Sequence, residues 1–240
     1  MVNKLCFGLV ALTACSAQSS PSELTLPDAS QAARTDAPNN PPPPPPGADA
    51  AVVPADAATP AGDACVPQVT QLLVNPAFDN APIGTGWSQT LIDVLSPLIT
   101  DADGVVEHTT PYKAWLGGFE AGTGTVKDSL VQNVAIPANT THLVLTGMYD
   151  VRTDELPSTI EYDTAKLVIT ELDGTTIVTV LALSNTAPTT AWTMFGHAFT
   201  QNLSGKTVRV RLTSTNDLSD ATSFFFDSLA LTATHGCAPN

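Results

Sequence analysis

Residues 223 to 231 read SFFFDSLAL, a run of aromatic and aliphatic residues interrupted by one carboxylate, Asp227. Side chains of an extended strand alternate between two faces, so Asp227 is expected to point the same way as Phe225, Leu229 and Leu231. We take that face as the core side. A bare charge in a core costs several kcal/mol of desolvation, so Asp227 must have a partner there.

The same period of two residues runs through most of the chain from residue 66 onward. In KTVRVRLTST (206–215) the alternation turns the apolar residues inward and Arg209, Arg211 and Thr213 outward. Two apolar runs joined around Asp173 and Gly174 are typical of a β-hairpin. No ten-residue stretch has a helical repeat. The pattern predicts an all-β sandwich of two antiparallel sheets, with about ten strands in total.

The N-terminus reads MVNKLCFGLVALTAC, with Lys4 before an apolar stretch that ends at Leu12. The stretch is too short to span a bilayer, which indicates a signal peptide over residues 1–14. Residues 12–15 resemble the bacterial lipobox, and the resemblance implies that Cys15 is lipidated. Ser16 after it implies sorting to the outer membrane. The alternative is an ordinary secretory signal with an incidental cysteine.

Residues 15–64 differ in composition from the rest of the chain. Residues 16–64 hold eleven of the twenty prolines, six of them consecutive at 41–46, and no aromatic residue. Such a segment cannot bury enough apolar surface to offset its ordering entropy, so we interpret it as a disordered, proline-rich tether. The domain organisation predicted is therefore signal peptide, tether, and a folded domain over residues 65–240.

Two cysteines remain after the signal peptide and the lipidation site, Cys65 before the first predicted strand and Cys237 after the last. In an oxidising compartment this pattern predicts a disulfide, with two free thiols as the alternative. The formal net charge is −14, and residues 66–240 contain 17 acidic and 7 basic residues. This balance disfavours nucleic acid as a partner.

A resemblance covers nearly all of residues 70–232. The segments SLVQNVAIPA (129–138), SGKTVRVRLTSTND (204–217) and TSFFFDSLAL (222–231) are similar to jelly-roll, galactose-binding-like modules related to carbohydrate-binding modules. Such modules accompany secreted bacterial peptidases and glycosidases. In them the last strand commonly carries two adjacent aspartates, where this chain has Asp227 and Ser228.

The resemblance implies a structural calcium. Many modules of this fold hold one between the last strand and an N-x-x-F-E segment, which corresponds here to residues 75–79 and ends in Asp79. Calcium takes six to eight oxygen ligands, so Asp79, Asp227 and nearby carbonyls are the expected site. The competing interpretation is a buried Asp227 that accepts hydrogen bonds from backbone N–H groups.

Aromatic residues offer the candidates for ligand binding. In PYKAWLGG (111–118) the alternation places Trp115 on one face with Lys113, so Trp115 is expected to be partly exposed and available to stack on a sugar. Packing of Trp115 against a neighbouring loop is the alternative. Trp87 and Trp192 are assigned to the core.

No catalytic constellation is found. The four histidines are scattered, and HExxH, CxxC and GxSxG motifs are absent. Asp154, Glu155, Glu161 and Asp163 fall in a predicted loop, where solvated acids are normal. We therefore expect no enzyme, but a surface lipoprotein that binds a glycan. The alternative is a structural or adhesive lipoprotein that contacts cell-surface proteins and binds no sugar.

Overall fold

The computed structural model of the chain describes residues 65–90, 97–118, 125–217 and 219–237. The predicted signal peptide, the lipidation site Cys15 and the tether lie outside these residues. Within them every regular element is a strand, and none is a helix long and apolar enough to cross a membrane. The strands are β1 (Gln68–Gln71), β2 (Ser88–Thr90), β3 (Ile99–Thr100), β4 (Lys113–Gly117), β5 (Val126–Ala135), β6 (His142–Thr153), β7 (Thr164–Thr170), β8 (Thr176–Ser184), β9 (Thr193–Ala198), β10 (Thr207–Asn216) and β11 (Thr222–His235).

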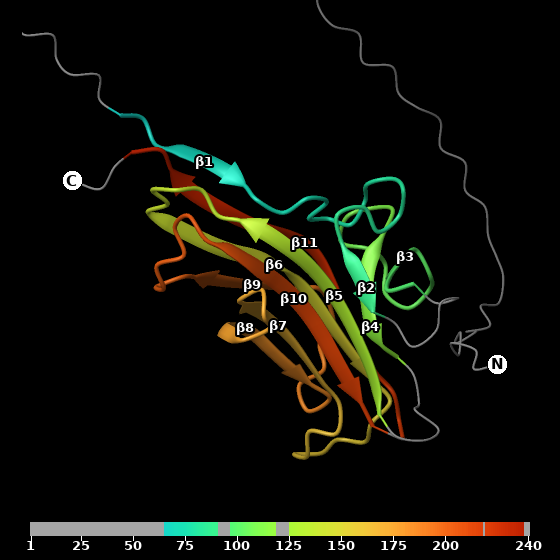
Figure 1. The fold of residues 1–240 in the computed structure, drawn as a ribbon. Coiled ribbons are helices and arrows are strands. Elements are labelled where there is room, and N and C mark those ends of the chain that lie inside the picture. The colour runs from blue at the N-terminus through green and yellow to red at the C-terminus, as the bar shows by residue number, and fades with distance from the viewer. Residues whose placement is uncertain (1–64, 91–96, 119–124, 218, 238–240) are drawn as a thin grey trace, which may run out of the picture. The chain divides into compact units, whose positions relative to one another are not determined.

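The strands form two antiparallel sheets that pack as a sandwich (Figure 1), so the predicted fold class is confirmed. The first sheet has the order β3-β4-β11-β6-β9, and β1 pairs with the C-terminal part of β11. We call it the β11 sheet. The second, which we call the β10 sheet, has the order β2-β5-β10-β7-β8. The long central strands β10 and β11 are the two whose sequences carry the clearest apolar pattern.

The core lies between the two sheets and follows the predicted alternation. On β10, Val208, Val210 and Leu212 are buried in the core, whereas Arg209 and Arg211 point away from it. On β11, Phe224 and Phe226 face the core opposite Val151 and Tyr149 of β6. Branched and aromatic side chains on one face of each sheet thus supply the apolar area that holds the sandwich together.

The sequence pattern placed Asp227 on the core side of its strand, together with Leu229 and Leu231, and this prediction is wrong. The register between β11 and β6 shifts between Asp227 and Ala230, so that Ser228 and Leu229 together stand opposite Gly147. Ser228 has a φ of 49°, in the left-handed region that the first residue of a G1 β-bulge adopts. The bulge reverses the alternation, so Leu229 faces the core while Asp227 faces the outer side of the β11 sheet.

The disulfide predicted between the two ends of the domain is present. Cys65 and Cys237 are bonded, with their Cα atoms 5.6 Å apart. The bond lies next to the β1–β11 pair, where Gln68 is opposite His235. It therefore ties the first strand of the domain to the last, which is the strand that carries the bulge.

The bulge generates a prediction about Gly147. A Cβ atom added there would lie 2.5 Å from Leu229 Cδ2 and 2.8 Å from Phe195 Cε1, both in the core. The variant Gly147→Ala should therefore lose about 1–3 kcal/mol of unfolding free energy, as overpacked cores do. Denaturant titration measures this loss of unfolding free energy.

Gly196→Ala is the matched control, because Gly196 lies opposite Thr146 on the neighbouring strand and a Cβ there meets only Thr146 Cγ2 at 3.7 Å. We expect this variant to change the unfolding free energy by less than about 0.5 kcal/mol. Equal losses in both variants would contradict the core contact of Leu229.

Candidate functional site

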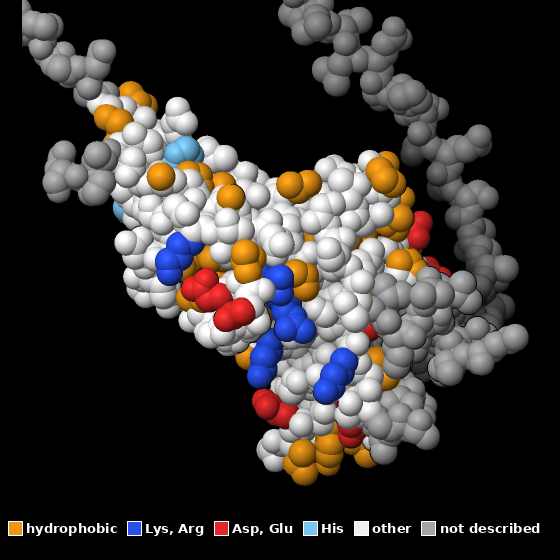
Figure 2. Space-filling model, in the orientation of Figure 1, with side chains coloured by type: hydrophobic (Ala, Val, Ile, Leu, Met, Phe, Trp, Pro, Cys, Tyr) orange, Lys and Arg blue, Asp and Glu red, His pale blue; other side chains and the backbone are white. Residues whose placement is uncertain are grey.

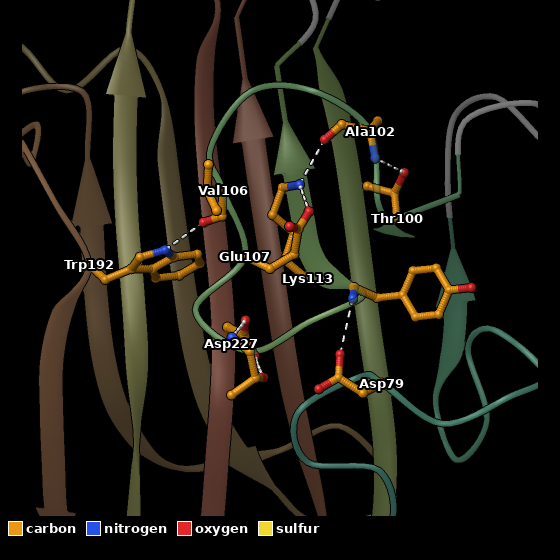
Figure 3. Close-up of polar contacts among 10 residues, drawn as sticks. Asp79, Thr100, Ala102, Val106, Glu107, Lys113, Trp192 and Asp227 are labelled. Atoms are coloured by element: carbon orange, nitrogen blue, oxygen red, sulfur yellow. Dashed lines mark hydrogen bonds and ion pairs between the residues drawn. The ribbon is translucent and has the colours of Figure 1, made fainter. Parts of the chain in front are cut away.

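Residues 101–112, which we call the cover segment, lie between β3 and β4 and run across the outer side of the β11 sheet (Figure 3). The backbone N–H of Thr109 donates to Asp227, and Trp192 Nε1 donates to the carbonyl of Val106 over 2.8 Å. A Cβ atom at Gly104 would touch the rings of Phe225 and Trp115. The cover segment therefore buries a second, smaller set of residues on the outer face of this sheet.

Asp227 is fully buried beneath the cover segment and is satisfied by hydrogen bonds. Its Oδ2 accepts the backbone N–H of Thr109 and its Oδ1 accepts the Thr109 hydroxyl, each at 2.9 Å. The backbone N–H of Ser228 donates to Oδ1 as well. Burial raises the pKa of Asp227, the bonds from Thr109 and Ser228 offset part of that effect, and the negative charge of Asp79 adds to it. The compensation that Asp227 needs thus comes from the cover segment and the bulge.

Asp79 and Asp227 fit a calcium site only in part. Asp79 is near enough to Asp227 to affect its pKa, and the Asp79 Oδ1 accepts the backbone N–H of Tyr112 at 3.0 Å. Across the described residues no group of three His, Cys, Asp or Glu side chains is placed to hold a metal. Calcium prefers six to eight oxygens, so most ligands would have to be backbone carbonyls or hydroxyls. Calcium at Asp79 and Asp227 stays a prediction.

The expected exposure of Lys113 is wrong. Lys113 is fully buried. Its Nζ is satisfied there, because it donates to Glu107 Oε1 at 2.8 Å and to the carbonyl of Ala102 at 2.7 Å (Figure 3). Burial by itself would raise the pKa of Glu107, but the hydrogen bond and positive charge of Lys113, together with the hydrogen bond from the backbone N–H of Glu107 itself, outweigh burial, and the pKa lies below its usual value. Lys113 therefore fastens the cover segment to β4 and does not present a charge to a ligand.

The expected exposure of Trp115 is also wrong, and so is the placement of Trp192 in the core. Trp115 is 9% exposed, and its ring centroid is 5.1 Å from that of Phe225 beneath the cover segment. The alternative of packing against a neighbouring loop is thus the one observed. Trp192 is half-buried and contacts His108 edge to face. Trp87 is in the core as expected, with its Nε1 donating to the carbonyl of Asn75.

The acids of the 154–163 loop are not all solvated. Asp163 is fully buried, and its two carboxylate oxygens accept the backbone N–H groups of Asp217 at 2.8 Å and Thr222 at 2.9 Å. Burial raises the pKa of Asp163, and these hydrogen bonds offset part of the rise. Asp163 therefore joins the start of β7 to the connection between β10 and β11. Nothing in its sequence context distinguishes it from its solvated neighbours.

A pocket of about 550 Å³ lies at one end of the sandwich, between the turn before β6 and the turn after β9. Amide and hydroxyl side chains line it around the ring of Phe199, which is half-buried. Its lining residues are Asn139, Thr140, Thr141, Leu143, Phe199, Thr200, Gln201, Asn202, Leu203 and Ser204. Polar groups placed beside an aromatic ring are the chemistry of a small-ligand site.

The residue pattern of the chain did not predict this pocket. The only signal was the juxtaposition of Phe199 with two amides, Gln201 and Asn202, in a predicted turn. Such a polar turn is common at the surface of any domain. The second wall, which includes Asn139, comes from a turn some sixty residues earlier, and pairing of β6 with β9 brings the two together.

No known family profile matches the chain, and no curated protein matches it. Solved structures with a similar arrangement include the carbohydrate-binding module TmCBM61 in complex with β-1,4-galactotriose (14% identity, 68% of this chain, 97% of that chain, TM-score 0.44). The xylan-binding module CBM15 (11% identity, 72% of this chain, 100% of that chain, TM-score 0.38) and an apo cyclase from Fischerella sp. (16%, 72%, 98%, TM-score 0.45) are others. At these identities and TM-scores the neighbours assign neither a ligand nor an activity to this chain.

The burial of Asp227 generates a prediction about pH. Its raised pKa means that the folded protein takes up a proton at a higher pH than the unfolded chain, so the protonated carboxyl adds stability that is lost as the pH rises. The Asp227→Asn variant cannot titrate there. With EDTA present, the unfolding free energy of wild type minus that of Asp227→Asn should therefore increase as the pH falls from 7 toward 4.

The same measurement in calcium tests the metal. An ion held by Asp79 and Asp227 requires ionised carboxylates, so calcium should raise the wild-type minus variant difference at pH 7 and reverse its slope with pH. Asp79→Asn should abolish that calcium dependence. Identical curves in calcium and in EDTA would contradict the calcium prediction. A flat difference in EDTA would contradict the raised pKa of Asp227.

Proposed function

We propose that the chain is a non-catalytic glycan-binding module, displayed on the tether from a lipid anchor at Cys15. The observation that carries the proposal is the pocket beside Phe199. Sugar hydroxyls both donate and accept hydrogen bonds, as do the amides of Gln201 and Asn139, and the carbon faces of a sugar ring pack against an aromatic ring. A pocket of about 550 Å³ is within the usual range for a small ligand.

Some polar groups of the pocket are bonded within the domain, and others are available to a ligand. The hydroxyl of Ser204 accepts the backbone N–H of Thr140, and the Asn202 Oδ1 accepts the backbone N–H of Ser204. These bonds hold the two walls in place. Gln201 and Asn139 are exposed and take part in none of the side-chain bonds found among the described residues, so their amides are free to bind.

The buried acids support a non-catalytic role because their oxygens are occupied. Asp163 holds two backbone N–H groups, and Asp227 holds Thr109 and Ser228. A general acid or base must instead lie within hydrogen-bond reach of a substrate. The chain also lacks the GxSxG and HExxH motifs of common hydrolases.

A second candidate is an adhesive lipoprotein that binds other proteins. It is favoured by the apolar residues exposed near the start of the domain, where Val66 is 78% and Val69 is 70% exposed. Val69 lies on β1 and Val66 just before it, and exposed apolar residues at a sheet edge are a feature of protein contact surfaces. The glycan and adhesive functions are separated by the binding experiment that follows.

A glycan array tests the pocket. The wild-type chain should bind at least one glycan in a dose-dependent manner, and the double variant Thr200→Ala/Gln201→Ala should weaken that binding by about tenfold, since two hydrogen bonds contribute roughly 1.4 kcal/mol together. Leu156→Ala is the matched control, because Leu156 is exposed in the loop after the far end of β6 and should bind as the wild type does.

A flat array for the wild-type chain would contradict the glycan function. In that case crosslinking in the intact envelope should recover protein partners if the adhesive candidate is correct. Binding that survives unchanged in Thr200→Ala/Gln201→Ala would place the sugar elsewhere on the domain.

The anchor is tested separately. The variant Cys15→Ala should lose incorporation of labelled fatty acid and appear in the soluble fraction, because several acyl chains on one cysteine would otherwise hold the protein at the membrane. The comparison is fractionation of envelopes that express wild type or variant at equal levels. A Cys15→Ala protein that stays with the membrane would contradict the lipoprotein proposal.

A further inference from the structure

We propose that the outward face of the β10 sheet is a second binding site, one for an anionic polysaccharide that carries carboxylate or sulfate groups. The face uses none of the residues that line the pocket beside Phe199. The pocket and this face share only the class of ligand, a glycan. The face is assigned from the distribution of charge between the two sheets.

The five strands of the β10 sheet contain four basic residues, Lys127, Lys166, Arg209 and Arg211. They contain one acid, Asp128, which is buried and accepts the backbone N–H of Gly117. All four basic residues point away from the core. Figure 2 shows Lys and Arg side chains gathered in a band on this side of the molecule. In a chain with a formal charge of −14, the strands of this sheet thus present four outward cations and no outward acid, and the acids beside them in Figure 2 lie outside these strands.

The β11 sheet has the opposite arrangement. Its two basic residues are both neutralised within the sheet or by the cover segment. Lys113 lies 2.8 Å from Glu107, and Arg152 Nε lies 2.7 Å from Asp150. The acids of this sheet are in turn buried. The domain therefore pairs the cations of the β11 sheet with acids, whereas the four cations of the β10 sheet form no ion pair with a described residue.

The register places the four cations along the length of the β10 sheet. Arg209 is paired with Asn133 and Arg211 with Val131, while Thr213 pairs with Lys166 and Thr215 with Lys127. From Arg209 to Thr215 the strand advances by six residues, or about 20 Å at roughly 3.3 Å per residue. This is a band that suits an extended polymer better than a single small anion.

The two guanidinium groups are oriented but not neutralised. Arg209 Nε donates to Asn133 Oδ1 at 3.1 Å, and Arg211 Nε donates to Ser129 Oγ at 3.3 Å. None of the four cations has an ion pair with a carboxylate of the described residues. The terminal N–H groups of the arginines therefore remain for a ligand, and a guanidinium fork matches carboxylate and sulfate oxygens.

The remaining residues of the face favour a polysaccharide over other polyanions. Hydroxyls and an amide separate the cations, among them Ser129, Thr213 and Asn133, and these can bond to sugar hydroxyls. None of the five strands contains an aromatic residue, on which the bases of a single-stranded nucleic acid would stack. The outward apolar residues Val131 and Val168, which flank Arg211, are half-buried and buried, whereas binding at a lipid surface scales with inserted apolar area.

The experiment compares one polymer in a charged and an uncharged form. The full chain carrying Cys15→Ala, which has no acylation site, is titrated with polygalacturonate and with highly methyl-esterified polygalacturonate in 20 mM and in about 150 mM salt. We expect binding to the acid form alone and weakening of that binding at the higher salt, where the screening length falls to about 8 Å.

Variants then locate the site. Arg209→Gln/Arg211→Gln should weaken binding of polygalacturonate by about tenfold or more, whereas Arg209→Lys/Arg211→Lys keeps the charge and should lose less. Lys206→Gln is the matched control. Its ammonium lies 3.8 Å from Glu171, so its charge is already offset and its removal should have little effect. An unchanged thermal midpoint shows that each variant is folded.

Three outcomes would overturn the inference. The first is equal affinity for the two forms of the polymer, or no binding of either. The second is binding that Arg209→Gln/Arg211→Gln leaves unchanged. The third is binding to anionic lipid vesicles but not to polygalacturonate, which would assign the face to a membrane. Because Thr200→Ala/Gln201→Ala leaves this face intact, it should bind polygalacturonate normally even if the pocket binds no sugar.

Discussion

The β-bulge at Ser228 is the constraint on which the arrangement of the β11 sheet depends. Two residues of β11 stand opposite Gly147 of β6, a position where a side chain would collide with Leu229. The bulge keeps Leu229 and Leu231 in the core while it sends Asp227 to the outer face. A strand without the bulge would place either the carboxylate or the leucines on the wrong side, at a cost of several kcal/mol.

The cover segment supplies the hydrogen bonds that Asp227 needs in its outer position. Thr109 satisfies both oxygens of Asp227, Lys113 pairs with Glu107, and Trp192 holds the carbonyl of Val106. These contacts join the cover segment to β11, to β4 and to the residue just before β9, all in the same sheet. The result is a sheet that is covered on both faces in this region, with its charged groups ion-paired or hydrogen-bonded and its outer aromatic residues buried. This side of the domain is therefore built for stability.

Among the residues that the structure describes, no segment covers the cations of the β10 sheet, and this difference divides the described domain into a structural side and an accessible side. Charge follows the same division, because the β11 sheet pairs its cations with acids whereas the β10 sheet does not. In an acidic chain an unpaired basic face costs little folding free energy as long as water solvates it. It does create a local field that attracts anions to one surface only.

Residue pattern alone determined the class of the fold, because the alternation of apolar and polar residues on a strand such as β10 is a local property of the backbone. It also predicted the disulfide between Cys65 and Cys237, with two free thiols as the alternative, and the structure confirms the bond. The direction of Asp227, the burial of Lys113 and Trp115, and the position of Trp192 were decided only by the tertiary structure. Local alternation does not reveal a one-residue bulge or a loop that folds over the outer face of a sheet. For the same physical reason the pocket beside Phe199 and the band of cations emerge only when strands distant in sequence pair side by side.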